Sequence, residues 1–567
     1  MKIVAAITAD FDRTFLGLPS RLMADLRGET VIRRTIKRLC QAKELAGVHL
    51  LVTSDQADIA RSAVGDLSEN VSVNVETHDA GSVPWASYVA ASRKWSLDSW
   101  RGGLAGTTLY DEFSHPWLLE ALARRTSADA VLDVPAAAVL IDPQLIDGLI
   151  RHYTKHREQA RLAIMQTAPG LSSILYQAEL LAELVNCATP PGRIFAYHPE
   201  HPVHDPLLQP CTCPTQATIA HASGRCIADT TTAMRRLERM LDELASGGSD
   251  SDTNTNDAGP DAMAISRWLL GHRHTPLSTW PDELEIEITT ADSLPDSTLR
   301  PRGSALQRSG QMDRPTFERI VEEYARSGDD RLLVFGGFGD PLLHPEFAAL
   351  VRFVRSVGIL GIAVRTAAVA LDEAAIHALL DASVDVLHVM LDATTPETYC
   401  RVHGVDHFER VTANLERLFS VQQEQTAPRP VVVCELMKTP ETLDEMEPFY
   451  DQWVQRIGSA MISGPSRYAG LWPHRAVVNM TPPSRFACSR LYHRAMVLAD
   501  GRLTLCDQDF RGHCAVGQMG EAAGEKRAST LSELWQSSML ADARAAHAAG
   551  RYNGLPLCRD CDEWHRP

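Results

Sequence analysis

The sequence predicts a multidomain α/β protein, in which two layered units joined by a polar linker precede a small cysteine-rich cap. Strand-like and helix-like runs alternate along most of the 567 residues, a pattern typical of largely parallel sheets covered by helices. Residues 246–258 consist almost wholly of Ser, Gly, Asp, Asn and Thr, which indicates a flexible linker. We therefore expect four parts, with the boundaries 1–245, 246–263 (the linker), 264–478 and 479–567.

Composition excludes several classes of protein. A net charge of −17 argues against a general nucleic-acid binder. No apolar run is long enough to span a membrane, and the start MKIVAAITAD predicts a first strand rather than a signal peptide. We expect a cytoplasmic protein without a membrane partner, whose 12 cysteines are reduced or metal-bound.

The N-terminal unit shows the alternation most clearly. Strands are expected at 2–8, 48–53 and 129–134, and helices at 30–45 and 142–156. Strands that alternate with helices favour a parallel, layered sheet.

Several short motifs in this unit occur in a recognisable order. They are Ser20-Arg21-Leu22, Leu26 to Glu29, Arg101-Gly102, Leu140 to Pro143, and Ala228-Asp229-Thr230. In this order they resemble nucleotidyltransferases that make CMP-sugars. The resemblance implies a Rossmann-like, nucleotide-diphosphosugar-transferase-like sandwich that binds a nucleotide or sugar nucleotide, with Arg21 and Asp229 as remnants of that site.

Two departures argue against nucleotidyl transfer. The family's Pro-Gly-Lys after Ser-Arg-Leu is missing, and Ala137 stands where the family places a metal-binding Asp. Asp229 then has two interpretations, a remaining metal ligand or the N-cap of a helix over 230–244. A second possible metal site is Cys211, Cys213 and Cys226 with nearby histidines at 201, 204 and 221, although unpaired cysteines in a surface loop are the favoured interpretation.

The central unit begins with an alternating strand over 283–288. A helix over 314–325 and strands over 331–335, 361–365, 386–391 and 431–436 follow. This order predicts an open, TIM-like partial barrel of about six strands.

Two motifs in this unit resemble radical SAM enzymes. GGFGDPLLHP at 336–345 is similar to the family's SAM-binding turn, which implies a SAM-pocket-like role for Gly336, Gly337, Gly339, Asp340 and Pro341. The loop after the first strand matches the family at Thr289, Thr290 and Leu294, but its three cysteine positions hold Asp292, Asp296 and Leu299. Without these thiolates the loop cannot build the SAM-binding cluster, so SAM is a doubtful cofactor.

The C-terminal cysteines have a specific spacing. Cys488, Gly501 and Cys506 form C-x12-G-x4-C, and Cys558 and Cys561 form C-x-x-C. This resembles SPASM or shorter twitch domains, and the resemblance implies one auxiliary 4Fe-4S cluster held by the four cysteines. Structural zinc and free thiols are the alternatives, and Cys514 is surplus.

Three functional interpretations follow. The favoured one is a degenerate radical SAM/SPASM-like iron-sulfur protein that acts as a binding, scaffold or partner protein. Its partner would be an active radical SAM or sugar-pathway enzyme that modifies a glycan, peptide or natural product. The second is an enzyme that binds SAM or a sugar nucleotide for non-radical chemistry. The third is a radical SAM enzyme with a displaced cluster.

Overall fold

The computed structural model describes residues 1–65, 67, 71–200, 205–246, 259–275, 277–519 and 529–566. The chain forms two compact units, Met1–Arg273 and His274–Pro567. Most of the predicted linker, residues 247–258, lies outside the described residues. Helix α9 (Ala262–Gly271) buries Ile265, Trp268 and Leu269 in the core of the first unit. The expected start of the second unit at residue 264 is therefore wrong, because this helix has its apolar face in the first core.

The first unit contains a seven-stranded sheet with the order β3-β2-β1-β4-β6-β5-β7. β1 lies parallel to β2 and β4, whereas β6 runs antiparallel to β4. The predicted strands are confirmed as β1, β2 and β4. The bounds are β1 (Ile3–Thr8), β2 (Gly47–Thr53), β3 (Val73–His78), β4 (Ala130–Asp133), β5 (Leu162–Met165), β6 (Ile174–Gln177) and β7 (Thr212–Cys213).

The helices of the first unit are α1 (Val31–Leu39), α2 (Ala57–Val64), α3 (Ala86–Arg93), α4 (Pro116–Thr126), α5 (Pro143–His156), α6 (Ala178–Leu184), α7 (Ala217–Ala220), α8 (Thr231–Ser246) and α9. Helix α5 begins as predicted, with Asp142 as its N-cap. Helix α1 ends at Leu39 rather than Leu45. The carboxylate of Asp147 accepts the backbone N–H groups of Lys43 and Glu44 at 2.8 and 3.0 Å, which stabilises a turn there.

The second unit contains a nine-stranded sheet with the order β13-β12-β11-β10-β9-β8-β14-β15-β16. Strands β8 to β13 are parallel and follow one another in sequence order, as expected of an open partial barrel. The bounds are β8 (Glu283–Ile286), β9 (Leu332–Phe335), β10 (Gly361–Thr366), β11 (Val386–Met390), β12 (Val431–Met437), β13 (Ala460–Ser463), β14 (Arg494–Val497), β15 (Arg502–Thr504) and β16 (Ala515–Gln518). Because β14 pairs with β8, the cysteine-rich segment continues the barrel sheet.

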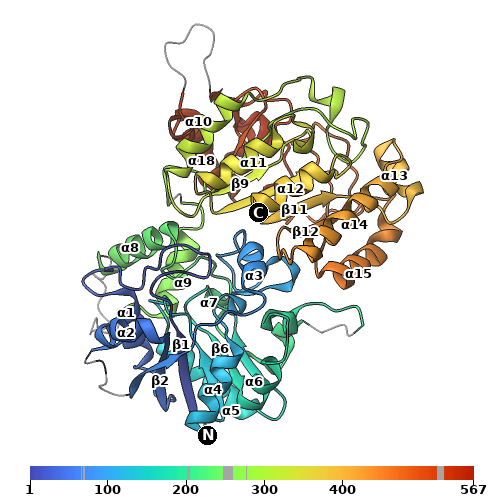
Figure 1. The fold of residues 1–567 in the computed structure, drawn as a ribbon. Coiled ribbons are helices and arrows are strands. Elements are labelled where there is room, and N and C mark those ends of the chain that lie inside the picture. The colour runs from blue at the N-terminus through green and yellow to red at the C-terminus, as the bar shows by residue number, and fades with distance from the viewer. Residues whose placement is uncertain are drawn as a thin grey trace. The chain divides into compact units, whose positions relative to one another are not determined.

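The helices of this unit are α10 (Arg314–Ala325), α11 (Phe347–Ser356), α12 (Glu373–Asp381), α13 (Pro396–His403), α14 (Phe408–Glu424), α15 (Met446–Ile457), α16 (Arg490–His493), α17 (Leu531–Trp535), α18 (Ser538–Ala548) and α19 (Pro556–Arg559). Figure 1 shows α11 and α12 beside strands β9 and β11. Among the described residues, no helix has the length and apolar character needed to cross a bilayer.

The two faces of the barrel sheet differ in polarity. Alternate residues such as Leu284, Ile286 and Val364 belong to the apolar core of the unit. Residues next to these along each strand, including Glu285 in β8 and Arg365 in β10, point to the other face of the sheet. That polar face is largely buried, and it bears the candidate sites of this unit.

Candidate functional site

The three positions that replace the family's cysteines meet three different environments. Asp292 forms an ion pair with Arg302, and its side chain is 1% exposed. Asp296 is exposed. Leu299 is buried in a small apolar cluster with Val402 and Met437.

Buried arginines accompany this loop. Arg300 Nη1 lies 2.6 Å from Asp392 Oδ2, and its Nη2 lies 2.9 Å from Glu435 Oε2. Burial disfavours the charged guanidinium, but the two carboxylates outweigh that cost and raise the pKa of Arg300. His388 Nε2 also lies 2.9 Å from Glu435 Oε2, so this carboxylate is shared by two basic groups.

The glutamates of the first barrel strand take part in the same kind of pairing. Glu285 lies 3.0 Å from Arg365 Nη1, and Glu287 forms a bidentate ion pair with Arg308. The alternating pattern of this strand is real, but its polar face is turned into the unit rather than towards solvent. A buried carboxylate is tolerated because a cation and hydrogen bonds accompany it.

The glycine-rich turn is closely packed against the first strand. The backbone N–H groups of Gly337 and Phe338 donate to the Glu285 and Glu287 carboxylates at 2.8 and 3.1 Å. A Cβ on Gly339 would lie 2.1 Å from the carbonyl oxygen of Thr289, so a side chain does not fit there. Packing against the backbone that follows β8 therefore accounts for glycine at position 339.

Asp340 and Pro341 complete this turn. The Asp340 carboxylate is fully buried and accepts hydrogen bonds from Thr366 Oγ1 at 2.9 Å and from the Ala367 N–H at 3.0 Å. Burial raises the pKa of Asp340, which these hydrogen bonds counteract. The position thus ties the turn to the end of β10.

The four C-terminal cysteines lie around one cavity. Cys488 and Cys558 are buried, and Cys506 and Cys561 are half-buried. Burial raises the pKa of Cys558 to about 12, and the neighbouring thiols of Cys561 and Cys488 contribute to the same shift. The cavity lining is Arg485, Cys488, Arg490, Leu491, Cys506, Gln508, His547, Leu557, Cys558, Cys561, Glu563 and Trp564.

The chemistry of this cavity fits an iron-sulfur cluster. Four thiols converge there from segments that are far apart in sequence. Arg490 adds a buried positive charge, ion-paired to Asp507 at 2.8 Å, that would offset an anionic group. His547 also lines the cavity, is buried, and has no hydrogen-bond partner for its Nε2 among the described residues. A ligand in the cavity could supply that partner.

A cleft of the first unit contains the residues that the sequence predicted to belong to a nucleotide site. A cavity of about 470 Å³ lies among the ends of β1, β2 and β4, and its lining includes Arg21, Ala137 and Asp229. The Ala228 N–H donates to the carbonyl of Ala137 at 2.9 Å. The structure therefore brings side by side the two positions that the sequence resemblance singled out, of which only Asp229 has a carboxylate.

The carboxylate of Asp229 is paired with the guanidinium of Arg225. Its Nε lies 2.8 Å from Asp229 Oδ1, and its Nη2 lies 2.8 Å from Glu112 Oε2. Glu112 in turn pairs with the buried Arg93 at 2.8 Å. Burial raises the pKa of Asp229 although Arg225 opposes that shift.

Two expectations about this unit are wrong. Asp229 is not the N-cap of α8, because its carboxylate is engaged by Arg225 and Thr230 Oγ1 accepts the N–H of Ala233 at 3.1 Å. Cys213 and Cys226 do not lie in a surface loop, since both are buried in the core. The histidines at 201 and 204 lie outside the described residues, and Cys211, Cys213 and Cys226 form no metal-binding group with the described side chains.

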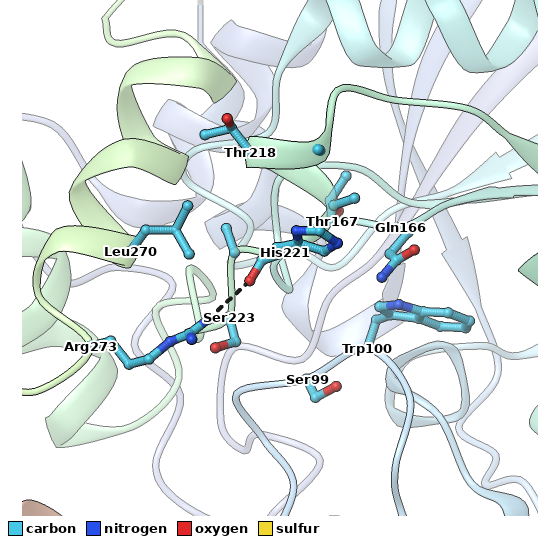
Figure 2. Close-up of a pocket in the computed structure, with 12 residues that line it drawn as sticks. Ser99, Trp100, Gln166, Thr167, Thr218, His221, Ser223, Leu270 and Arg273 are labelled. Carbon is cyan, nitrogen blue, oxygen red and sulfur yellow. Dashed lines mark hydrogen bonds between the residues drawn. The ribbon is translucent and has the colours of Figure 1, made fainter. Parts of the chain in front are cut away.

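A further pocket of the first unit was not predicted from the sequence. Figure 2 shows Trp100 and Gln166 on one side of it and His221 near its centre. Arg273 Nη2 donates to the carbonyl of His221 at 3.2 Å. These residues come from four distant segments, so no local sequence motif indicated the pocket.

Fold and sites together define an α/β protein with a parallel barrel sheet and a cysteine-lined cap. Within it, residues 300–452 match the model of the radical SAM superfamily, and residues 488–562 match SPASM, an iron-sulfur cluster-binding domain. The matches support both domains in this chain. The first match begins directly after the loop that holds positions 292, 296 and 299.

Two curated relatives extend this picture. An uncharacterized protein of Treponema pallidum (strain Nichols) is 25% identical over 308 residues, 52% of this chain and 82% of its own length. A GTP 3',8-cyclase of Chlorobaculum tepidum is 29% identical over 140 residues, which are 24% of this chain and 41% of its own length.

Two solved structures are similar to different parts of the chain. BtrN in complex with AdoMet and 2-DOIA is 16% identical and covers 50% of this chain and 92% of its own, with a TM-score of 0.34. A cytidylyltransferase from Leptospira borgpetersenii is 14% identical and covers 48% of this chain and 95% of its own, with a TM-score of 0.33.

Proposed function

We propose that this protein is a radical SAM/SPASM-like iron-sulfur protein that has lost the SAM-cleaving centre and serves as a binding, scaffold or partner protein. The pathway would be one that modifies a glycan, a peptide or another natural product. The ion pair of Asp292 with Arg302 is the observation that carries the proposal. The guanidinium of Arg302 contacts the carboxylate at position 292, where a SAM-binding cluster would need a thiolate.

Charge strengthens this argument. The SAM-binding cluster needs three thiolates and one open iron. Here the corresponding loop offers one carboxylate already neutralised by Arg302, one exposed carboxylate and one apolar side chain. Arg300 and Arg302 are both buried beside it, and their guanidiniums are paired with the carboxylates of Asp392, Glu435 and Asp292 rather than with thiolates. We therefore assign no radical chemistry to the barrel.

The cap is proposed to keep its cluster. Cys488, Cys506, Cys558 and Cys561 would hold one 4Fe-4S cluster, which supplies one-electron transfer when bound. Tetrahedral zinc would bring four sulfurs to about 3.8 Å from one another, given Zn–S bonds of about 2.3 Å. Iron and zinc analysis would separate that structural zinc site from a 4Fe-4S cluster, whose four irons would hold the thiolates farther apart.

The first unit is proposed to bind a nucleotide or sugar nucleotide without transferring it. Arg225 lies between Asp229 and Glu112, so a guanidinium takes the place of a divalent cation. With Ala137 at the second metal position, the carboxylate pair that the resemblance would require for Mg²⁺ near a triphosphate is incomplete.

The decisive experiment incubates the anaerobically reconstituted, dithionite-reduced protein with SAM and measures 5′-deoxyadenosine. No product above that of SAM with dithionite alone is expected. Cleavage that persists in the wild type and is lost in a Cys400→Ala/Cys434→Ala variant, the two cysteines of the barrel, would contradict the proposal and favour a displaced cluster. SAM bound without cleavage would favour an enzyme with non-radical chemistry.

A further inference from the structure

His547 lies in the wall of the cysteine-lined cavity, and its ring is hydrogen-bonded to the backbone of Cys488, 59 residues away in sequence. It belongs to helix α18, which is outside both cysteine motifs. Its side chain is 2% exposed. Nothing in the spacing of the cysteines identifies it, and neither the barrel nor the cleft of the first unit uses it.

One hydrogen bond determines which ring nitrogen of His547 is the donor. The backbone N–H of Cys488 donates to His547 Nδ1 at 3.2 Å. Since an amide N–H can only donate, Nδ1 is the acceptor, and the proton of the neutral ring is on Nε2. The ring is thereby oriented by the backbone of a cysteine in the cavity.

The structure shows no acceptor for the Nε2–H group among the residues that it describes. Nε2 is buried and without a hydrogen-bond partner among the described residues. A buried donor left unpaired is costly, and native proteins seldom leave one. The side chain also lines the cavity of the four cysteines, so an acceptor inside that cavity would satisfy it.

We propose that His547 is a positioning residue for the cluster, and that its Nε2–H donates a hydrogen bond to a cluster sulfur. This inference rests on the proposed cluster in the cap. Hydrogen bonds to the sulfurs tune the potential of an iron-sulfur cluster. A donor stabilises the reduced, more electron-rich state, so His547 raises the reduction potential.

Redox titration of the full-length holoprotein tests this inference. In His547→Leu we expect the reduction equilibrium to fall about tenfold, a decrease of about 59 mV for a one-electron couple. His547→Gln should keep most of the wild-type potential, because its amide can accept from the Cys488 N–H and donate into the cavity. Tyr552→Phe is the matched control: its ring lies 5.0 Å from that of His547 but outside the cavity lining, and no change is expected.

Pulsed EPR of the reduced wild type, labelled with ¹⁵N-histidine, provides a measurement that does not depend on any variant folding. A weakly coupled histidine nitrogen is expected. Equal potentials in wild type and His547→Leu, or no histidine coupling in the loaded wild type, would overturn the inference while leaving the cluster in place. A reconstituted wild type that binds no iron would overturn the proposed cluster, and the inference with it.

Discussion

The loop at 289–302 and the cavity at the C-terminal cysteines are both places where a metal cluster would bind, yet their contents are opposite. In the loop, the ligand positions are filled by Asp292, Asp296 and Leu299, and a buried guanidinium compensates the one buried carboxylate. In the cap, four thiols face one cavity and a buried imidazole donor lacks a partner. The difference teaches that a carboxylate buried in such a loop needs a countercharge to stay buried, whereas a cavity of thiols leaves its polar atoms open to a ligand.

The cap should depend entirely on its cysteines. Cys558→Ala or Cys561→Ala is expected to abolish a cluster of about four irons per chain. It should also loosen the residues after about 485, because metal binding and folding are coupled in such domains. Iron analysis, the absorption spectrum and hydrogen exchange would measure this loss.

Cys514→Ala is the matched control, since this cysteine is surplus to the four and does not line the cavity. It should keep its iron. A colourless protein with one zinc per chain would instead turn the cap into a structural zinc site and erase the contrast with the loop.

The loop should depend on its ion pair. Asp292→Leu leaves Arg302 buried without its carboxylate and should destabilise the second unit by roughly 3–5 kcal/mol. Asp292→Leu/Arg302→Met removes both charges and should recover most of that loss. Differential scanning calorimetry of the full chain would measure both.

Arg314→Ala is the control, because its pair with Glu318 is exposed; it should cost at most about 0.5 kcal/mol. If Asp292→Leu were as mild as this control, charge compensation would not explain the loop. Restoring cysteine at 292, 296 and 299 should destabilise the unit in the same way, because it also removes the carboxylate that pairs with Arg302.

Asp133 is a buried carboxyl group that is neutralised by a proton, whereas Asp292 and Asp229 are neutralised by an arginine. It is fully buried, its Oδ2 accepts from Ser114 Oγ at 2.7 Å, and burial raises its pKa to about 8. Between pH 4 and 8 the folded state therefore holds a proton that the unfolded state has released. The free energy of unfolding should fall as pH rises through this window, by at most about 1.4 kcal/mol per pH unit.

Hydrogen exchange of the peptide around β4 at pH 5, 6 and 7 would report this dependence, after correction for the intrinsic exchange rate. Asp133→Asn should flatten it. An unchanged slope in the variant would mean that Asp133 is ionised in the fold.

The smallest effect is expected in the cleft of the first unit. Because Arg225 already neutralises Asp229 and Glu112, EDTA or added Mg²⁺ should leave the affinity for CMP unchanged, and CTP with an acidic sugar should release no pyrophosphate. Calorimetric titration and a pyrophosphate assay would test this. CMP binding that depends on Mg²⁺ would contradict the proposal that the guanidinium of Arg225 takes the place of the metal ion.

The sequence by itself determined the elements whose signals are local. The period of the apolar residues predicted helix 314–325 with the bounds that the structure has, and the series of barrel strands in their order. Cysteine spacing indicated a cap whose four thiols share one cavity. These signals lie within one strand, one helix or one motif, so neighbouring residues suffice to read them.

Tertiary structure alone decided which polar groups meet. Alternation over 283–288 could not tell that Glu285 and Glu287 pair with arginines instead of facing water. Arg225 and Arg302 lie close in sequence to Asp229 and Asp292, but no pattern in the sequence marks them as partners. His547 reaches Cys488 across 59 residues. Such pairs form because a charge or donor removed from water must find a partner, and only the folded chain decides which group, near or distant in sequence, supplies it.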